Sequence, residues 1–144
     1  MKIFTIGFTK KTAEDFFSRL TNAGASRIAD VRLNNVSQLA GFAKKDDLKY
    51  FAKTICGIGY THLPSLAPEK DMLDEYKKKT HDWSAYETRF NSLMRERRIE
   101  QTLSREELAG ACLLCSEDKP HYCHRRLVAE YLRSAWGDLE IVHL

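Results

Sequence analysis

Hydrophobic and polar positions alternate at the start of the chain and then change to a helical spacing. Lys2 to Gly7 alternates as a β-strand does, and Thr12 to Asp15 resembles a helix capping box, with Asp in place of the usual Glu or Gln. We expect Gly24 to end this helix and Ser26 to Leu33 to form the second strand. The apolar face of the expected helix consists of Phe16, Phe17, Leu20 and Ala23. A strand, a helix and a strand within about thirty residues predict a right-handed parallel unit.

The rest of the chain continues this alternation of strands and helices. Residues 34–42 have no sustained period, and a helix that ends at Gly57 is expected to begin near Lys45. Its inward face would consist of Leu48, Phe51, Ala52 and Ile55. The remaining expected elements are a strand at Gly59–Pro64, two helices between Pro68 and Leu103 with a break near Thr80–Asp82, a strand at Ala111–Cys115, a helix at Cys123–Trp136 and a strand at Leu139–Leu144.

The alternation predicts an α/β fold in a single domain of residues 1–144. We expect a mostly parallel sheet of about five strands flanked by helices, as in a Rossmann-like three-layer sandwich, with an α+β arrangement as the alternative. In an open parallel sheet, ligands bind beyond the carboxyl ends of the strands. The residues expected at that edge, where polar groups would converge, are Gly7, Phe8, Asp30, Arg32, His62, Cys115 and Glu117.

Composition sets limits on the class of protein. The chain has 144 residues, 43% of them hydrophobic, which is sufficient for one core. Its formal net charge of +3 is compatible with an anionic ligand but is not by itself a sign of nucleic-acid binding. Because residues 1–7 are too short for a secretory signal and no apolar run has membrane-spanning length, we expect a cytoplasmic protein without a membrane partner. In that compartment Cys56, Cys112, Cys115 and Cys123 are expected to be reduced.

Reactive side chains are most concentrated between Cys112 and Arg126, where an expected strand turns into an expected helix. Cys123, His124 and Arg125 would lie in the first turn of that helix. Free N–H groups at a helix N-terminus favour anions and lower the pKa of a nearby thiol. This turn is therefore the predicted functional site.

Several motifs resemble those of the domain of unknown function 488 family of bacterial and archaeal proteins. They are Thr5-Ile6-Gly7, Asp30-Val31-Arg32, Gly59-Tyr60-Thr61-His62-Leu63-Pro64, and the specific pair Leu114-Cys115-Ser116-Glu117 and Cys123-His124-Arg125. Residues 34–42 and 83–86 resemble a subgroup of the family. The resemblance implies an α/β sandwich and a set of pocket residues, but no settled activity. Two positions depart from the family pattern: Phe8 replaces a frequent His, and Leu66-Ala67-Pro68 replaces a Leu-Gly-Gly turn.

Arg125 indicates an anion site, because a cation in the first turn of a helix opposes the helix dipole and needs a partner. A bound anion could be that partner, and Arg32 could hold the same anion through a bidentate contact. The residues assigned to ligand binding are Gly7, Arg32, Asn34, Ser37, His62 and Arg125. The alternative is an internal network of Arg32, Arg125, Asp30 and Glu117 that only stiffens the edge of the sheet.

The candidate catalytic residues are Asp30, Glu117, Cys115, Cys123 and His124. Asp30 and Glu117 could transfer protons, with His62 or His124 as the group that titrates near neutral pH. Cys115 or Cys123 could be a low-pKa nucleophile or half of a reversible disulfide, and the alternative is a packed turn with inert thiols.

No metal is expected, because a zinc knuckle needs its cysteine pair on a turn. Cys112 and Cys115 lie in a predicted strand, where residues three apart point to opposite faces. Any metal site would have to use Cys115, Cys123 and His124.

The leading hypothesis is an enzyme that binds a small molecule with a phosphate or carboxylate group, such as a nucleotide, and has hydrolytic or transferase activity. No cofactor is identified, and Arg125→Ala is expected to abolish binding without unfolding. The first alternative is a non-catalytic module that binds nucleic acid or a protein through the basic residues of 77–98, although Glu residues interleave with them. The second is a thiol-based redox or metal-binding protein that uses Cys115, Cys123 and His124.

Overall fold

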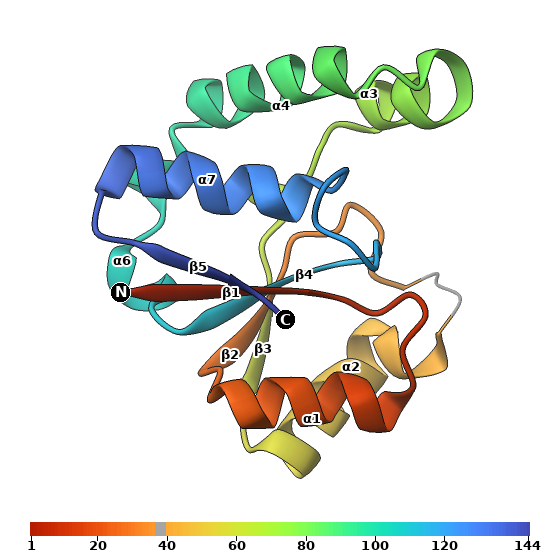
Figure 1. Cartoon of the computed structure of the whole chain (residues 1–144), viewed down its shortest axis with the longest axis vertical. Coiled ribbons are helices and arrows are strands. Elements are labelled where there is room, and N and C mark those ends of the chain that lie inside the picture. Colours follow the sequence, from red (N-terminus) through yellow and green to blue (C-terminus); the bar gives the residue numbers. More distant parts are fainter. Residues whose placement is uncertain (37–39) are drawn as a thin grey trace.

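The computed structural model describes residues 1–36 and 40–144, and these residues form one parallel sheet of five strands. The strands lie in the order β3-β2-β4-β1-β5, and every neighbouring pair is parallel. Their bounds are β1 Lys2–Gly7, β2 Arg27–Asp30, β3 Gly59–His62, β4 Ala111–Cys115 and β5 Glu140–His143. Figure 1 shows the sheet between two groups of helices, which confirms the predicted α/β fold.

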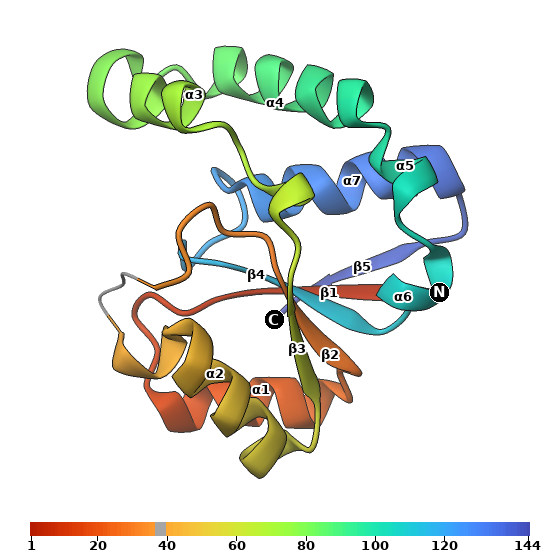
Figure 2. The same cartoon turned by 180° about the vertical axis from the view of Figure 1, so that it is seen from behind.

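Helices cover both faces of the sheet (Figures 1 and 2). On one face lie α1 (Ala13–Ala23) and α2 (Lys45–Phe51), which continues as the π-helical segment η2 (Ala52–Cys56). On the other face α7 (His124–Trp136) lies against the strands, and α4 (Trp83–Arg97) packs on the outer side of α7. The shorter elements are α3 (Lys70–Asp74) with its π-helical continuation η4 (Glu75–Thr80), α5 (Ile99–Thr102), α6 (Arg105–Leu108), and the 3-10 turns η1 (Gly41–Ala43) and η3 (Pro64–Leu66).

Capping residues set the helix ends where the sequence predicts them. The Thr12 hydroxyl accepts a hydrogen bond from the Asp15 N–H at 3.1 Å, and Gly24 ends α1 in the left-handed conformation with φ of 72°. Gly57 ends η2 in the same way. One prediction is wrong: Ile55 does not face inward but is 54% exposed, because the wider π-helical turn displaces it from the α-helical spacing.

Side chains of β4 alternate between the two hydrophobic clusters of the core. Cys112 and Leu114 pack with α1 and α2, whereas Leu113 and Cys115 pack on the side of α4 and α7. Cys112 and Cys115 therefore point to opposite faces, as predicted. Since β2 and β4 are neighbours, with Asp30 opposite Leu114, the loops that leave these two strands begin side by side.

Within the described residues, no helix combines the length and apolar content that crossing a lipid bilayer requires. The helix α4 has 15 residues, compared with the roughly 20 apolar residues that span a bilayer.

Candidate functional site

A pocket of about 210 Å³ lies beyond the carboxyl ends of β2 and β4, at the edge of the sheet that the sequence predicts. The loops after these strands and the α3–η4–α4 segment together form its lining. Six of the predicted site residues line it: Arg32, Asn34, Cys115, Glu117, Cys123 and His124. Four aromatic side chains complete much of the remaining surface: Tyr76, Trp83, Tyr86 and Tyr122.

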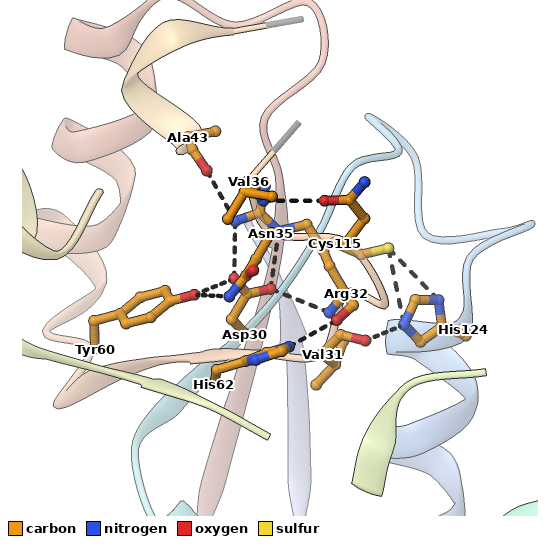
Figure 3. Close-up of polar contacts among 11 residues, drawn as sticks. Asp30, Val31, Arg32, Asn35, Val36, Ala43, Tyr60, His62, Cys115 and His124 are labelled. Atoms are coloured by element: carbon orange, nitrogen blue, oxygen red, sulfur yellow. Dashed lines mark hydrogen bonds and ion pairs between the residues drawn. The ribbon is translucent and has the colours of Figure 1, made fainter. Parts of the chain in front are cut away.

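Asp30 and Arg32 form a buried ion pair at the end of β2 (Figure 3). Nε and Nη2 of Arg32 donate to the two carboxylate oxygens of Asp30 at 2.9 and 2.8 Å, and Nη2 also donates to the Ala43 carbonyl at 2.8 Å. The Tyr60 hydroxyl donates to the same carboxylate. Burial and the bond to Asp30 raise the pKa of Tyr60 to about 12, so this hydroxyl keeps its proton. Asp30, which is 0% exposed, is therefore saturated by its neighbours and does not line the pocket.

One nitrogen of Arg32 remains without a partner in the part of the chain that the structure describes. Among the described residues, Nη1 is a buried side-chain donor that makes no hydrogen bond, although Arg32 as a whole is only 3% exposed. Its guanidinium carbon lies 5.4 Å from the centre of the Phe8 ring, so Phe8 packs against the cation. A buried charged donor without an acceptor is costly, and Arg32 borders the pocket.

His62 and His124 hold two consecutive carbonyls of the segment that follows β2. Nε2 of His124 lies 2.6 Å from the Val31 oxygen, and Nε2 of His62 lies 2.9 Å from the Arg32 oxygen. A carbonyl can only accept, so both Nε2 atoms carry hydrogen. His62 therefore positions the backbone of Arg32 from behind the pocket. Both ring nitrogens of His124 lie near the sulfur of Cys115 (Figure 3), and the distances to Sγ are 3.5 Å from Nδ1 and 4.0 Å from Nε2.

Cys115, Cys123 and His124 form a compact buried cluster. Cys115 ends β4, Cys123 is the N-cap of α7 and His124 is its first residue. Their exposures are 7, 2 and 7%, and one ligand atom from each lies within 4.8 Å of the others. The cluster lines the pocket, and Cys112 and Cys56 lie outside its lining.

The three buried thiols have different acidities. The hydrogen bond from Cys123 lowers the pKa of Cys115 despite its burial, and Arg125 and the backbone N–H groups of Ser116 and Glu117 lower it further. Burial, followed by the interaction with Cys115, raises the pKa of Cys123 well above its ordinary value. Burial also raises the pKa of Cys112. Cys115 is thus the only one of these three buried thiols whose pKa is lowered.

Arg125 does not line the pocket. It is 1% exposed; Nη1 donates to the Glu117 carbonyl, Nη2 to the Asp118 carbonyl at 3.2 Å, and Nε to the Thr5 hydroxyl at 3.3 Å. The partner that the helix dipole requires is therefore the backbone of the loop after β4. Gly7 supports the same loop, because a Cβ at this position would overlap the Glu117 carbonyl.

The remaining predicted residues have distinct surroundings. Glu117 lines the pocket, is about half exposed and pairs with Lys77 at 3.0 Å. Asn34 also lines the pocket, and its side-chain oxygen accepts from the Val36 N–H at 3.1 Å. Ser37 lies outside the described residues. The structure thus brings Glu117 and Asn34 to the pocket with Arg32 and the Cys–His cluster, and it places Gly7, Asp30, His62 and Arg125 behind the lining.

Sequence reasoning did not assign the aromatic part of the lining to the site. Trp83 stacks on Tyr86 with ring centres 5.1 Å apart, and the Tyr122 ring lies 5.6 Å from Trp83 at its edge. From the sequence, Trp83 and Tyr86 are expected on the apolar face of a helix and within the motif of residues 83–86 that resembles a family subgroup, but not in the pocket. The available signal was the number of large aromatic residues at the beginning of that helix, close to the turn that carries Tyr122.

Several basic residues of 77–98 are engaged by other parts of the protein. Arg89 contacts Asp71 at 2.7 Å and Glu75 at 3.4 Å, and Arg97 donates to the carbonyls of Ser65 and Ala67 at 2.8 and 2.7 Å. These partners hold α4 to the preceding segment. A nucleic-acid or protein interface on this region stays a prediction.

Comparison with known proteins gives one result. Searches of curated proteins and of solved structures found no match to the chain. A family model described as Domain of unknown function DUF488 matches residues 12–132, a range that contains all the residues lining the pocket. The chain therefore belongs to the DUF488 family, as its motifs indicate.

Proposed function

We propose that the protein is an enzyme that binds a small molecule with a phosphate or carboxylate group next to a planar ring, such as a nucleotide, and hydrolyses it or transfers a group from it. The observation that carries the proposal is Nη1 of Arg32, a buried donor without a partner among the described residues. An anionic oxygen is the acceptor that best satisfies a guanidinium N–H. Asp30 binds the other two guanidinium nitrogens, Nε and Nη2, and so keeps Arg32 oriented.

The aromatic lining supports a planar group on the ligand. The rings of Trp83 and Tyr86 are stacked, and Tyr122 borders the same space. Aromatic side chains offer stacking surface to a base or another flat ring. The volume of about 210 Å³ is below the roughly 300–1,000 Å³ of pockets for drug-sized ligands, which favours a small molecule over a stretch of polymer.

The reaction centre in this proposal is the cluster of Cys115, Cys123 and His124. It lines the same pocket as Arg32, so a ligand anchored by its anionic group would lie next to these side chains. Glu117 is the carboxylate available for proton transfer, because it is exposed to the pocket, whereas Asp30 is occupied by Arg32 and Tyr60. We place this activity in the reducing cytoplasm, where the thiols stay free.

Ligand binding to an Arg32→Lys variant tests the proposal. Lysine keeps a positive charge for Asp30 but removes the nitrogen Nη1 that is proposed to bind the anion. Thermal-shift measurements with inorganic phosphate, adenosine monophosphate and citrate identify the best probe, and calorimetry then measures its affinity. Because a hydrogen bond to a charged group contributes about 1.5–3 kcal/mol, we expect the variant to bind the best probe at least about tenfold more weakly.

The matched control is Arg19→Lys, which changes an exposed arginine that pairs with Asp15 on α1, away from the pocket. It should bind the best probe as the wild type does. Equal affinity of the wild type and the Arg32→Lys variant for every probe, or no binding of any probe by the wild type, would contradict the proposal.

A further inference from the structure

The side chains of Cys115, Cys123 and His124 have a geometry that suits a metal ion. Tetrahedral zinc with bonds of about 2.3 Å to sulfur and about 2.0–2.1 Å to nitrogen places a sulfur and a nitrogen ligand about 3.5 Å apart. The distance between Cys115 Sγ and His124 Nδ1 is 3.5 Å, and the three ligand atoms all lie within 4.8 Å of one another. Small side-chain rotations would bring the Cys123 sulfur to the same centre.

His124 is oriented as a metal ligand usually is. Metal-bound histidines almost always donate their second ring N–H to a carboxylate, a carbonyl or water, which fixes the tautomer and the ring plane. Nε2 of His124 lies 2.6 Å from the Val31 carbonyl. Nδ1 therefore keeps the lone pair that a metal would need. The Cys115 sulfur lies 3.5 Å from Nδ1 and 4.0 Å from Nε2 (Figure 3), so the Cys115 side chain would have to rotate toward the Nδ1 lone pair when a metal binds.

The backbone keeps the three ligands together without a metal. Cys115 is the last residue of β4, next to Gly7 of β1 and to the end of β2. Cys123 and His124 begin α7, which packs on the same strands. A site preformed in this way avoids much of the ordering that a flexible loop would undergo when it binds a metal.

We propose that Cys115, Cys123 and His124 form a three-ligand site for a soft or borderline divalent cation, Zn²⁺ in the first place, with its fourth position open to the pocket. Two thiolates and an imidazole suit Zn²⁺ and exclude Mg²⁺ and Ca²⁺, which need oxygen ligands. Three protein ligands and one exchangeable position are the arrangement of catalytic rather than structural zinc. All three residues line the pocket, so water or a ligand can reach the fourth position from there.

The sequence speaks against a zinc site at Cys112 and Cys115, whereas the proposed site uses Cys115 with Cys123. Cys112 and Cys115 do point to opposite faces of the sheet, and Cys112 packs against α1 and α2. The proposed site instead combines the end of a strand with the N-cap of the helix that follows it, across the loop of residues 116–122. The inference goes beyond anion binding and does not depend on it, because the metal ligands do not include Arg32.

Titration of the reduced, full-length protein with Co²⁺ and Zn²⁺ tests the site. The protein is treated with a chelator, dialysed and titrated without oxygen. We expect one equivalent of Co²⁺ to produce a sulfur-to-cobalt charge-transfer band with tetrahedral visible bands, and one equivalent of Zn²⁺ to remove them. Cys123→Ser should lower the Zn²⁺ affinity by about 100-fold or more, which exceeds the effect of losing a typical outer-shell partner.

Two matched variants serve as controls. Cys56→Ser removes a partly exposed thiol, and Cys112→Ser removes a buried thiol on the opposite face of the sheet. Both should bind one equivalent of metal like the wild type. Arg32→Lys should also keep its metal affinity, so that failure of anion binding and failure of the metal site are separate outcomes.

X-ray absorption at the zinc edge of the wild type gives a measurement that needs no variant. It should show two sulfur and two nitrogen or oxygen neighbours, even if Cys123→Ser does not fold. The proposal is overturned if the wild type binds clearly less than one equivalent, if zinc has no sulfur neighbours, or if a folded Cys123→Ser retains full affinity. Oxidative linkage of Cys115 to Cys123 in a protein that binds no metal would instead support a redox role.

Discussion

Arg32 and Arg125 are both buried arginines near the carboxyl end of a strand, yet their surroundings differ. Arg125 has all three nitrogens engaged, two by loop carbonyls and one by the Thr5 hydroxyl. Arg32 binds Asp30 and a carbonyl through Nε and Nη2, while its Nη1 has no partner in the described part of the chain. The two side chains are 3 and 1% exposed, respectively, so burial does not distinguish them.

The difference separates an arginine whose nitrogens are all matched from one with an unmatched nitrogen, and the unmatched nitrogen is the basis for proposing a ligand at Arg32. The guanidinium of Arg125 is satisfied by the loop it holds, so its loss should affect folding. Nη1 of Arg32 has no partner among the described residues, so a change that removes this nitrogen should affect the binding of an anionic ligand. Four substitutions or measurements test this comparison, beginning with the largest expected effect.

Arg125→Ala should destabilise the protein by about 4 kcal/mol or more. The change removes three hydrogen bonds of a charged group, leaves the carbonyls of Glu117 and Asp118 without this donor and creates a cavity where the buried side chain was. This reverses the expectation from the sequence that the variant loses binding but stays folded. Urea unfolding followed by circular dichroism measures the effect, and a loss below about 1 kcal/mol would contradict the structural role.

Gly7→Ala should destabilise the protein by about 2–3 kcal/mol, because the added Cβ would displace the Glu117 carbonyl and approach Nη1 of Arg125. Gly59→Ala is the matched control, since Gly59 also lies in a strand and no heavy atom is close to the position of its Cβ. Urea unfolding of both variants gives the comparison. Equal stabilities would mean that the loop moves away freely and that Gly7 does not position it.

Tyr60→Phe tests how much the Tyr60 hydroxyl stabilises the Asp30 carboxylate, which forms the ion pair with Arg32. The loss of its hydroxyl should cost about 1–2 kcal/mol at neutral pH, because the Asp30 carboxylate loses one of its donors. The pKa of Tyr60 is raised to about 12 in the folded state, above its ordinary value near 10. The contribution is therefore fully present below about pH 10 and is lost as pH rises through about 12.

Unfolding free energies between pH 8 and pH 11.5 measure this effect. The wild type should lose more stability over that range than Tyr60→Phe does. Tyr50→Phe, at an exposed position on α2, is the control and should follow the wild type. Parallel curves for the wild type and Tyr60→Phe would show that folding does not raise the pKa of the Tyr60 hydroxyl.

Most of the fold could be predicted because its signals are local. The apolar run of β4 and the helical spacing of α7 set both elements within one residue of their predicted bounds. The alternation along β4 also placed Cys112 and Cys115 on opposite faces. Ile55 was misplaced because a π-helical turn keeps the composition of an α-helix but changes its spacing.

The sequence predicted those residues of the site whose position follows from the ends of the strands. Cys115 ends β4, and Arg32 and Glu117 lie two residues beyond the ends of β2 and β4, so a parallel sheet brings them together. Two of the three partners of Arg125 are backbone carbonyls, which have no sequence signature, and their position depends on the close approach of Gly7. The aromatic lining depends on how the α3–η4–α4 segment lies over the sheet edge, and helical periodicity contains no information on that placement.

The smallest expected effect concerns His143, which lies on the far side of Thr5 from Arg125. Thr5 accepts a hydrogen bond from Arg125 Nε, so its hydroxyl hydrogen is free to donate to His143 Nδ1 at 2.6 Å. Burial, followed by the charge of Arg125, lowers the pKa of His143. The folded state therefore favours the neutral ring, and this stabilisation is present above about pH 6.5 and is lost as pH falls through the lowered pKa.

Titration of His143 by NMR should give a pKa below that of an unfolded peptide, and His143→Gln should reduce the loss of stability between pH 7.5 and pH 5. His143 does not line the pocket and contacts Thr5, which binds Arg125, so the substitution should leave the affinity for an anionic ligand unchanged. A loss of anion affinity in His143→Gln would show that the network around Arg125 reaches the pocket, and the division of roles between the two arginines would then be wrong.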